Sequence, residues 1–186
     1  MPRPREFDTE HALDAAVALV WKQGYAGTSV RQLCEAMEIN PGSFYAAFDS
    51  KDAFFRRVLA RYVEVQLPKL RPQPAAIRRW FRMITASSRR GQGCLLVNAA
   101  VESPGLDPDS QAEVSARLGG LEAFFVRCLG EHPHAKAHAE LLVATVVSIH
   151  VMSRGGSSMA KLRRIADHAL ELTGVGTTDA APATVR

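Results

Sequence analysis

Residues 40–51 read NPGSFYAAFDSK, with a proline and a glycine directly ahead of three aromatic residues at helical spacing. The letters Asn-Pro-Gly are typical of a turn. They can also open a helix, because Asn is a favoured N-cap and proline is tolerated at the first helical position. With Asn40 as the cap, Phe44 and Phe48 lie on one side of such a helix. The stretch therefore predicts a short helix anchored to a core by two phenylalanines.

Amphipathic segments flank this stretch on both sides. Residues 8–23 carry apolar side chains at spacings of three and four and end at Gly24, a candidate C-cap. A shorter run at residues 30–37 follows, and a longer one extends from residue 51 to about residue 66. A helix, a tight turn and a short second helix are the order of a helix-turn-helix, whose second helix enters the major groove of DNA.

The remaining sequence also has helical periodicity, with no alternating strand pattern of useful length and no internal repeat. Helices are expected at residues 74–87, 94–102, 108–130, 136–152 and 157–173. The expected fold is all-α, with an N-terminal three-helix helix-turn-helix domain, a C-terminal helical bundle and about nine helices in total. We expect domains at residues 1–66 and 67–174, followed by a disordered tail at residues 175–186.

Composition excludes several classes of protein. With 47% hydrophobic and 23% charged residues, the chain of 186 residues is typical of a folded protein of at most two domains. Three scattered cysteines indicate free thiols, since an odd number is not a disulfide framework. The apolar run at residues 141–149 is shorter than the ~18 to 20 residues of a membrane span, and no apolar segment follows the basic N-terminus. We therefore expect a cytoplasmic location and no membrane partner.

The net charge of +4 suggests an acidic partner, but it is unevenly distributed. Residues 1–61 contain eight Lys or Arg and eight Asp or Glu, so this part has no net charge. If it binds nucleic acid, it must do so through a few placed cations and backbone amides. Arg3 and Arg5 are candidates for an arm that reaches into a minor groove.

The segment GYAGTSVRQLCEAMEINPGSFYAAFDSKDAFF, residues 24–55, resembles the DNA-binding domain of the tetracycline-repressor (TetR) family of transcriptional regulators. The resemblance rests on residues in register and without gaps: Gly24-Tyr25, Thr28-Ser29-Val30, Leu33, Ile39, Gly42-Ser43-Phe44-Tyr45, Phe48 and Ser50-Lys51. The rest of the chain resembles the family only in the number and order of helices. The resemblance implies an all-α homodimer that pairs through its last two helices and holds a small-molecule effector in its second domain.

It also implies the residues that contact double-stranded DNA. Thr28 and the nearby amides at the start of the second helix would hold phosphate, and Lys51 would hold another phosphate. Ser29 is a further residue implied to contact DNA. The residues implied to face the groove are Pro41, Gly42, Ser43 and Tyr45, and Arg31 is a further candidate for DNA contact.

Two departures from the family pattern are notable. Glu38 stands where the family usually has glycine, so a left-handed backbone there would be mildly strained. Ala46 and Ala47 replace larger polar residues of the recognition helix, which removes groups that could read bases. Specificity is then expected to depend on Ser43, Tyr45, Arg31 and DNA shape.

The second domain offers candidates for an effector site. The candidates for ligand contact are Trp80, Phe81, Cys94, Phe124, Phe125, Val146 and His150. Plain core packing is an equally good interpretation of the apolar members of this set. Cys94 follows two arginines and should lie in the first turn of a helix, which favours a reactive thiolate. The stretch GCLLVNAAVE also resembles a subgroup of the family whose cysteine reacts with electrophiles or oxidants, although a buried, inert thiol is the alternative.

Two further kinds of chemistry receive little support. Cys128, His132, His134 and His138 are metal ligands by residue type, but their spacing matches no known site, so we expect no metal and no other cofactor. No nucleophile, base and orienting partner occur at motif spacing, so an enzyme is not expected. The leading hypothesis is a ligand- or redox-responsive repressor that binds a palindromic operator as a homodimer. The alternative is an α-helical module that senses a small molecule, oxidant or metal and has weak or lost DNA binding.

Overall fold

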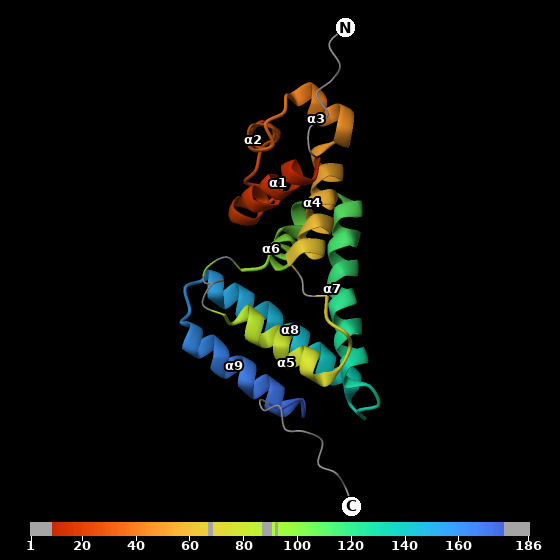
Figure 1. Ribbon diagram of the computed structural model, residues 1–186, viewed down its shortest axis with the longest axis vertical. Coiled ribbons are helices and arrows are strands. Elements are labelled where there is room, and N and C mark those ends of the chain that lie inside the picture. The colour runs from red at the N-terminus through yellow and green to blue at the C-terminus, as the bar shows by residue number, and fades with distance from the viewer. Residues whose placement is uncertain (1–8, 67–68, 87–90, 92, 177–186) are drawn as a thin grey trace, which may run out of the picture. The chain divides into compact units, whose positions relative to one another are not determined.

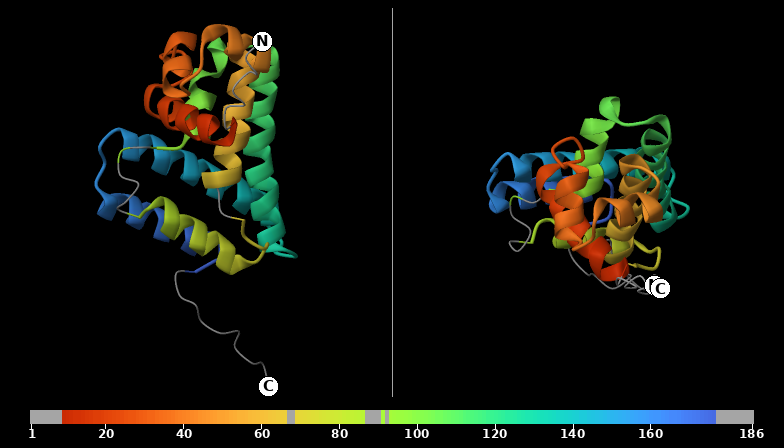
Figure 2. Two further views of the ribbon diagram at one scale, coloured as in Figure 1. Left: turned by 45° about the horizontal axis from the view of Figure 1, so that its top comes forward. Right: turned by 90° about the horizontal axis from the view of Figure 1, so that it is seen from above.

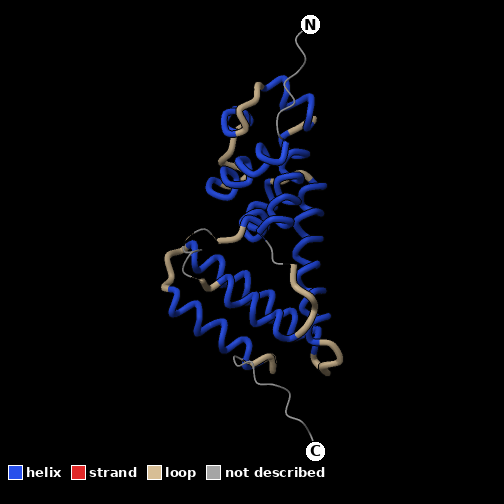
Figure 3. The backbone as a smooth tube through the Cα atoms, in the orientation of Figure 1, coloured by secondary structure: helices blue, strands red, loops and turns tan. Residues whose placement is uncertain are grey.

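The computed structural model describes residues 9–66, 69–86, 91 and 93–176. Its elements are α1 (Thr9–Gln23), α2 (Val30–Ala36), α3 (Pro41–Phe48), α4 (Lys51–Gln66), α5 (Pro74–Ile84), α6 (Leu95–Glu102), the 3₁₀ helix η2 (Ser103–Gly105), α7 (Pro108–Leu129), α8 (Ala135–Arg154) and α9 (Met159–Leu172). Figures 1 and 3 show helices joined by loops, and no strand occurs in the described residues. The predicted all-α fold is confirmed.

The chain forms two compact units, each of which is described by itself. Unit 1 combines Met1–Pro68 with Cys94–Arg117, and unit 2 combines Lys69–Gly93 with Leu118–Arg186. Helix α7 therefore contributes its first part to unit 1 and its second part to unit 2. Each compact unit consists of two separate segments of the chain, so the units do not correspond to the two predicted domains. The predicted boundary between residues 66 and 67 stays a prediction.

The core of the helix-turn-helix is an aromatic cluster between α3 and α4. The ring of Phe54 lies 5.1 Å from that of Phe44 and 4.6 Å from that of Phe48, in edge-to-face geometry. All three side chains are buried. Such pairs contribute roughly 0.5–1.5 kcal/mol each beyond the burial of their area. The two phenylalanines of the opening stretch thus anchor α3, as predicted.

Side-chain caps explain where α2 and α3 begin. At α2, the Ser29 hydroxyl accepts a hydrogen bond from Gln32 N while the Gln32 side chain accepts one from Ser29 N, which is a capping box. At α3, Asn40 Oδ1 accepts a bond from Ser43 N at 2.8 Å, and Pro41 is the first helical residue. Each cap contributes about 1 kcal/mol. The Asn40-Pro41-Gly42 sequence therefore begins a helix and does not form an isolated turn.

The connection between α2 and α3 requires a left-handed residue. Glu38 has φ of 56°, in the region that glycine occupies most easily. The conformation predicted from the sequence is therefore present, and a non-glycine residue adopts it. Left-handed backbone costs a residue with a Cβ roughly 1–2 kcal/mol.

Unit 2 is built on α5, α8, α9 and the second part of α7. Figures 1 and 2 show α8 and α9 side by side, and α5 packs against both. Leu142 and Ile149 of α8 are fully buried. By length and composition alone α8 is long and apolar enough to cross a membrane, with a mean hydropathy of 1.3 in its most apolar window, although the apolar run at residues 141–149 is shorter than a span. The core helix of a soluble protein meets the same criterion.

The described part of the chain extends slightly past the predicted start of the tail. Val175 is buried, and Arg78 Nη1 donates a hydrogen bond to its carbonyl oxygen at 3.0 Å. Val175 is therefore part of unit 2, and the predicted tail at residues 175–186 stays a prediction. Residues 177–186, and the candidate arm residues Arg3 and Arg5, lie outside the described residues.

Candidate nucleic-acid interface

Helix α3 presents an exposed face opposite its phenylalanine anchors. Tyr45 is 51% exposed, and its ring packs edge-on against the buried ring of Phe44, with the centroids 5.4 Å apart. Pro41 and Gly42 are also exposed, and Ser43 is half-buried. A Cβ added at Gly42 would lie 3.1 Å from Asn40 Oδ1, so a larger residue would press on the cap of the helix. The predicted groove-facing residues thus lie together on α3.

Ser29 and Thr28 at the start of α2 differ in accessibility. Ser29 is exposed, and its hydroxyl belongs to the capping box. Thr28 is buried, and its hydroxyl donates to Gly24 O at 2.6 Å. This hydroxyl closes the turn between α1 and α2, and the predicted phosphate contact of Thr28 stays a prediction. The backbone amides at the start of α2 remain the candidates there.

Lys51, the first residue of α4, lies against the same turn. Its Nζ donates to Tyr25 O at 2.9 Å and sits 4.1 Å from the centre of the Tyr25 ring. Burial lowers the pKa of the Lys51 ammonium group, and the carboxylates of Asp52 and Glu102 oppose this shift. The lysine thus has a partner in the protein, and its predicted phosphate contact stays a prediction.

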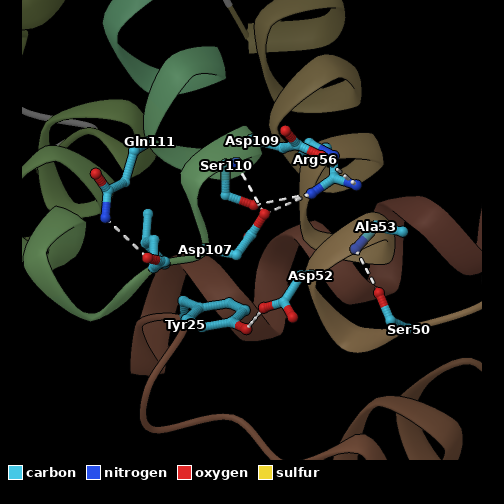
Figure 4. A network of polar contacts seen from close by, with 10 residues as sticks. Tyr25, Ser50, Asp52, Ala53, Arg56, Asp107, Asp109, Ser110 and Gln111 are labelled. Atoms are coloured by element: carbon cyan, nitrogen blue, oxygen red, sulfur yellow. Dashed lines mark hydrogen bonds and ion pairs between the residues drawn. The ribbon is translucent and has the colours of Figure 1, made fainter.

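Figure 4 shows the polar contacts that surround Tyr25 and Arg56 in unit 1. The Tyr25 hydroxyl donates to the Asp52 carboxylate, and burial together with this bond raises the pKa of Tyr25. Arg56 Nη1 donates to Asp107 Oδ1 at 3.1 Å and to Ser110 Oγ at 3.3 Å. These contacts tie α4 to the turn after α1 and to the start of α7.

Arg31 lies on the surface of α2. Its Nε donates to Glu35 Oε1 at 2.9 Å, and the two side chains are 88% and 61% exposed. Exposed pairs of this kind contribute only about 0–1 kcal/mol. A DNA phosphate could therefore replace Glu35 as the partner of Arg31 at little cost.

The predicted ligand residues divide between the two units. Six of them belong to unit 2, and Cys94 belongs to unit 1. The centroid of the Phe125 ring lies 5.9 Å from that of Trp80 and 6.4 Å from that of Phe81. The Phe124 ring lies 6.0 Å from that of Trp80. Val146 and His150 are buried on α8. These contacts fit the core-packing interpretation.

One cavity of about 380 Å³ opens between α5 and α9 in unit 2. It is lined by Phe81, Arg82, Thr85, Ala86, Arg163, Ala166, Asp167 and Leu170. Of the predicted ligand residues, only Phe81 borders it. The volume is in the range of small-molecule sites.

Cys94 is the N-cap of α6, one position before the predicted first turn. It is 6% exposed, and its Sγ accepts a hydrogen bond from the buried Tyr62 hydroxyl at 3.3 Å. The other two cysteines, Cys34 and Cys128, are also buried, and burial raises the pKa of both thiols. The arginines that precede Cys94 at positions 89 and 90 lie outside the described residues.

The histidines of the candidate metal set lie close together. The His138 ring is 4.6 Å from that of His132 and 5.9 Å from that of His134. In the part of the chain that the structure describes, however, no three His, Cys, Asp or Glu side chains are arranged to hold a metal ion.

Sequence reasoning missed one contact at this interface. Glu102, the last residue of α6, accepts a hydrogen bond from Ala26 N at 2.9 Å. The two residues are 76 positions apart, and no local pattern links them. The only signal in the sequence for the turn that Glu102 contacts is Gly24, which was predicted as the C-cap of the first helix.

Fold and site together define an all-α DNA-binding protein with a helix-turn-helix. Residues 12–58 match the family described as bacterial regulatory proteins, tetR family. The HTH-type transcriptional repressor ComR of Escherichia coli (strain K12) is 30% identical over 194 residues, which cover 91% of this chain and 90% of ComR. BdcR, a repressor from the same organism, is 46% identical over 61 residues, which cover 33% of this chain and 31% of BdcR.

Solved structures agree with these relatives. A cysteine mutant of the TetR family transcriptional regulator CifR, complexed with 26-bp operator DNA, has a TM-score of 0.76 and 28% identity, covering 91% of this chain and 98% of CifR. Reduced NemR of E. coli has a TM-score of 0.71 at 22% identity, covering 88% of this chain and 96% of NemR, which supports the fold alone. The chain belongs to the TetR family of transcriptional regulators.

Proposed function

We propose that this protein is a repressor that binds a palindromic operator as a homodimer and releases it in response to an effector. The observation that carries the proposal is the capped helix α3, which exposes Tyr45 on one side while Phe44 and Phe48 fix the other. A rigid short helix with an exposed aromatic residue is suited to the major groove. ComR, similar over most of its length, is a repressor, and CifR is bound to operator DNA.

Direct base contacts in this proposal come from Ser43 and Tyr45. Ala46 and Ala47, both exposed on α3, offer methyl groups for contact with thymine methyls. Ser29 and the amides at the start of α2 hold phosphate, and Arg31 exchanges Glu35 for a phosphate oxygen. With few direct hydrogen bonds to bases, DNA shape contributes much of the specificity.

The proposed dimer forms through an exposed stripe on α8. The stripe repeats at helical spacing and consists of Ala137, Leu141, Ala144, Ser148 and Val151. Leu141 is 41% and Val151 50% exposed, and Leu172 of α9 is 72% exposed. Contiguous apolar surface of this kind is commonly covered by a partner. A second copy would cover it and place two α3 helices about 34–36 Å apart on DNA.

We infer that an oxidant acts at Cys94. Hydrogen peroxide would transfer one oxygen atom to the Cys94 thiol and leave as water, so that the sulfur is oxidised to sulfenic acid and the peroxide is reduced to water. The added oxygen needs space beside Tyr62, which is only 1% exposed, and would separate α4 from α6. Cys94→Ser should bind DNA normally and lose peroxide-induced release, with Cys34→Ser as a control. Release that is unchanged in Cys94→Ser contradicts this role.

The experiment that tests the proposed function is selection of bound DNA from a random pool with the full-length protein. We expect enrichment of a palindrome whose half-sites are about one helical turn apart. The mass of the protein–DNA complex should correspond to two chains per site or a multiple of two. No enriched sequence would favour the alternative, a sensing module that has lost DNA binding.

A further inference from the structure

The turn between α1 and α2 determines where the helix-turn-helix begins. Gly24 has φ of 83° and is buried, and its carbonyl oxygen accepts a bond from the Thr28 hydroxyl at 2.6 Å. Thr28 N donates to Tyr25 O at 3.2 Å. The turn leads directly into the capping box of α2, so a change in its orientation would move α2 and, with it, α3.

Helix α6 reaches this turn through the Glu102 side chain. Glu102 Oε2 accepts a hydrogen bond from Ala26 N at 2.9 Å. A Cβ added at Gly24 would lie 2.3 Å from Glu102 Oε1, which is closer than any real contact. The carboxylate therefore occupies the space that a side chain at position 24 would need. Glycine is required there both for its positive φ and for the approach of Glu102.

Helix α4 holds the same peptide group from its other end. Tyr25 C=O and Ala26 N–H belong to one peptide bond, and Lys51 Nζ donates to that carbonyl at 2.9 Å. The anionic Glu102 thus accepts from the N–H while the cationic Lys51 donates to the C=O. Both charges are aligned favourably with the dipole of the peptide, and hydrogen bonds with ionised partners are stronger than neutral ones. We call Lys51, the Tyr25–Ala26 peptide and Glu102 the peptide clamp.

We propose that Glu102 is a positioning residue for DNA binding and acts through the peptide clamp. This inference rests on the proposed function, since it assigns a role in operator binding. Glu102 belongs to α6, outside the segment that resembles the family, and it makes the start of α2 depend on the position of α6. Lys51, implied by the resemblance to hold phosphate, is one half of the same clamp.

The test measures affinity of full-length variants for the operator found by selection, by fluorescence anisotropy. Glu102→Ala removes the acceptor and should weaken binding about tenfold, the effect of losing a bond to a charged group. Glu102→Gln keeps an acceptor and should stay within about threefold of wild type. Val101→Ala, at a 71% exposed position on the same helix, is the matched control and should bind as wild type.

These variants separate positioning from charge. If Glu102 acted only by repelling DNA phosphates, both Glu102→Ala and Glu102→Gln would bind more tightly than wild type. The slope of affinity against salt should stay unchanged in Glu102→Ala, since no phosphate contact is lost. Glu102→Asp keeps the charge but withdraws the carboxylate, and it should weaken binding even if Glu102→Ala misfolds.

A double-mutant cycle tests the second half of the clamp. If Lys51 and Glu102 act on one peptide, Lys51→Met combined with Glu102→Ala should weaken binding by less than the product of the two single effects. If the loss of affinity in the double variant equals the product of the two single losses, Lys51 and Glu102 act independently, which contradicts the clamp. Wild-type affinity in both Glu102→Ala and Glu102→Asp would also overturn it. Failure of the wild-type protein to bind any selected DNA would instead overturn the proposed function.

Discussion

Two aromatic clusters differ in exposure, one around α3 in unit 1 and one between α5 and α7 in unit 2. On α3, Phe44 is fully buried while its neighbour Tyr45 is 51% exposed. In unit 2, Trp80, Phe81 and Phe125 are all buried, and the ring of Phe125 contacts those of the other two. An exposed ring held by a buried one is suited to a partner, whereas a cluster closed on itself contributes stability. Residue type alone does not separate these two uses.

The largest expected effect is the loss of stability when a fully buried ring is removed, and both regions contain such a ring. Phe44→Ala and Phe125→Ala each remove a ring with no exposed surface, and each should lower the free energy of unfolding by about 3–5 kcal/mol. Urea denaturation followed by circular dichroism measures the loss. Tyr45→Ala is the control on α3 and should lower the unfolding free energy by only about 0.5–1.5 kcal/mol, the contribution of its edge-on contact with Phe44. A small loss in Phe125→Ala would mean that the cluster of unit 2 is an adaptable pocket after all.

The exposed stripe on α8, like Tyr45, is proposed to contact a partner, in this case a second copy of the chain. Leu141→Glu should raise the dimer dissociation constant at least about 100-fold, because a charge would be buried without a partner. Sedimentation velocity over a range of concentrations measures the shift. Val101→Glu introduces the same charge at an exposed position of unit 1 and should leave the dimer intact. If Leu141→Glu and Val101→Glu have the same dimer dissociation constant, the stripe on α8 is not the interface.

The groove contact of Tyr45 should be the next effect in size. Tyr45→Ala should weaken operator binding at least about tenfold, corresponding to ~1.4 kcal/mol, with no change in the dimer. Tyr45→Phe separates the ring from the hydroxyl, since it keeps the packing on Phe44 and loses only a hydrogen bond. Titration of operator DNA measures both variants. An affinity equal to wild type in Tyr45→Ala would remove this residue from the interface.

The smallest effect concerns the strained link between α2 and α3. Glu38→Gly should stabilise the protein by about 0.5–1 kcal/mol, because glycine adopts φ of 56° without a Cβ clash but has more freedom in the unfolded chain. Thermal unfolding measures the gain. Glu38→Ala removes the same charge while it keeps the Cβ, so it should give no such gain. Equal stabilisation by both variants would point to charge rather than backbone strain.

Local signals explain which parts of the site could be predicted. The start of α3 depends on Asn40 and Pro41, and the start of α2 depends on Ser29 and Gln32, all within four residues of each other in each case. Periodicity likewise located the α-helices of the described residues, but it did not predict the 3₁₀ helix η2. The inward turn of the Thr28 hydroxyl was missed, because a threonine before a helix reads as an exposed cap unless the turn that it closes is known.

The sequence by itself determined the helices, their caps, the left-handed residue at position 38 and the resemblance to the TetR family, because each depends on neighbours a few residues apart. Only the tertiary structure decided which ring is exposed, which cysteine meets Tyr62, and which charges meet at the Tyr25–Ala26 peptide. Glu102 and Lys51 come from different helices, and no periodicity or capping rule relates them to that peptide. Their meeting depends on how α4 and α6 pack against the turn after α1.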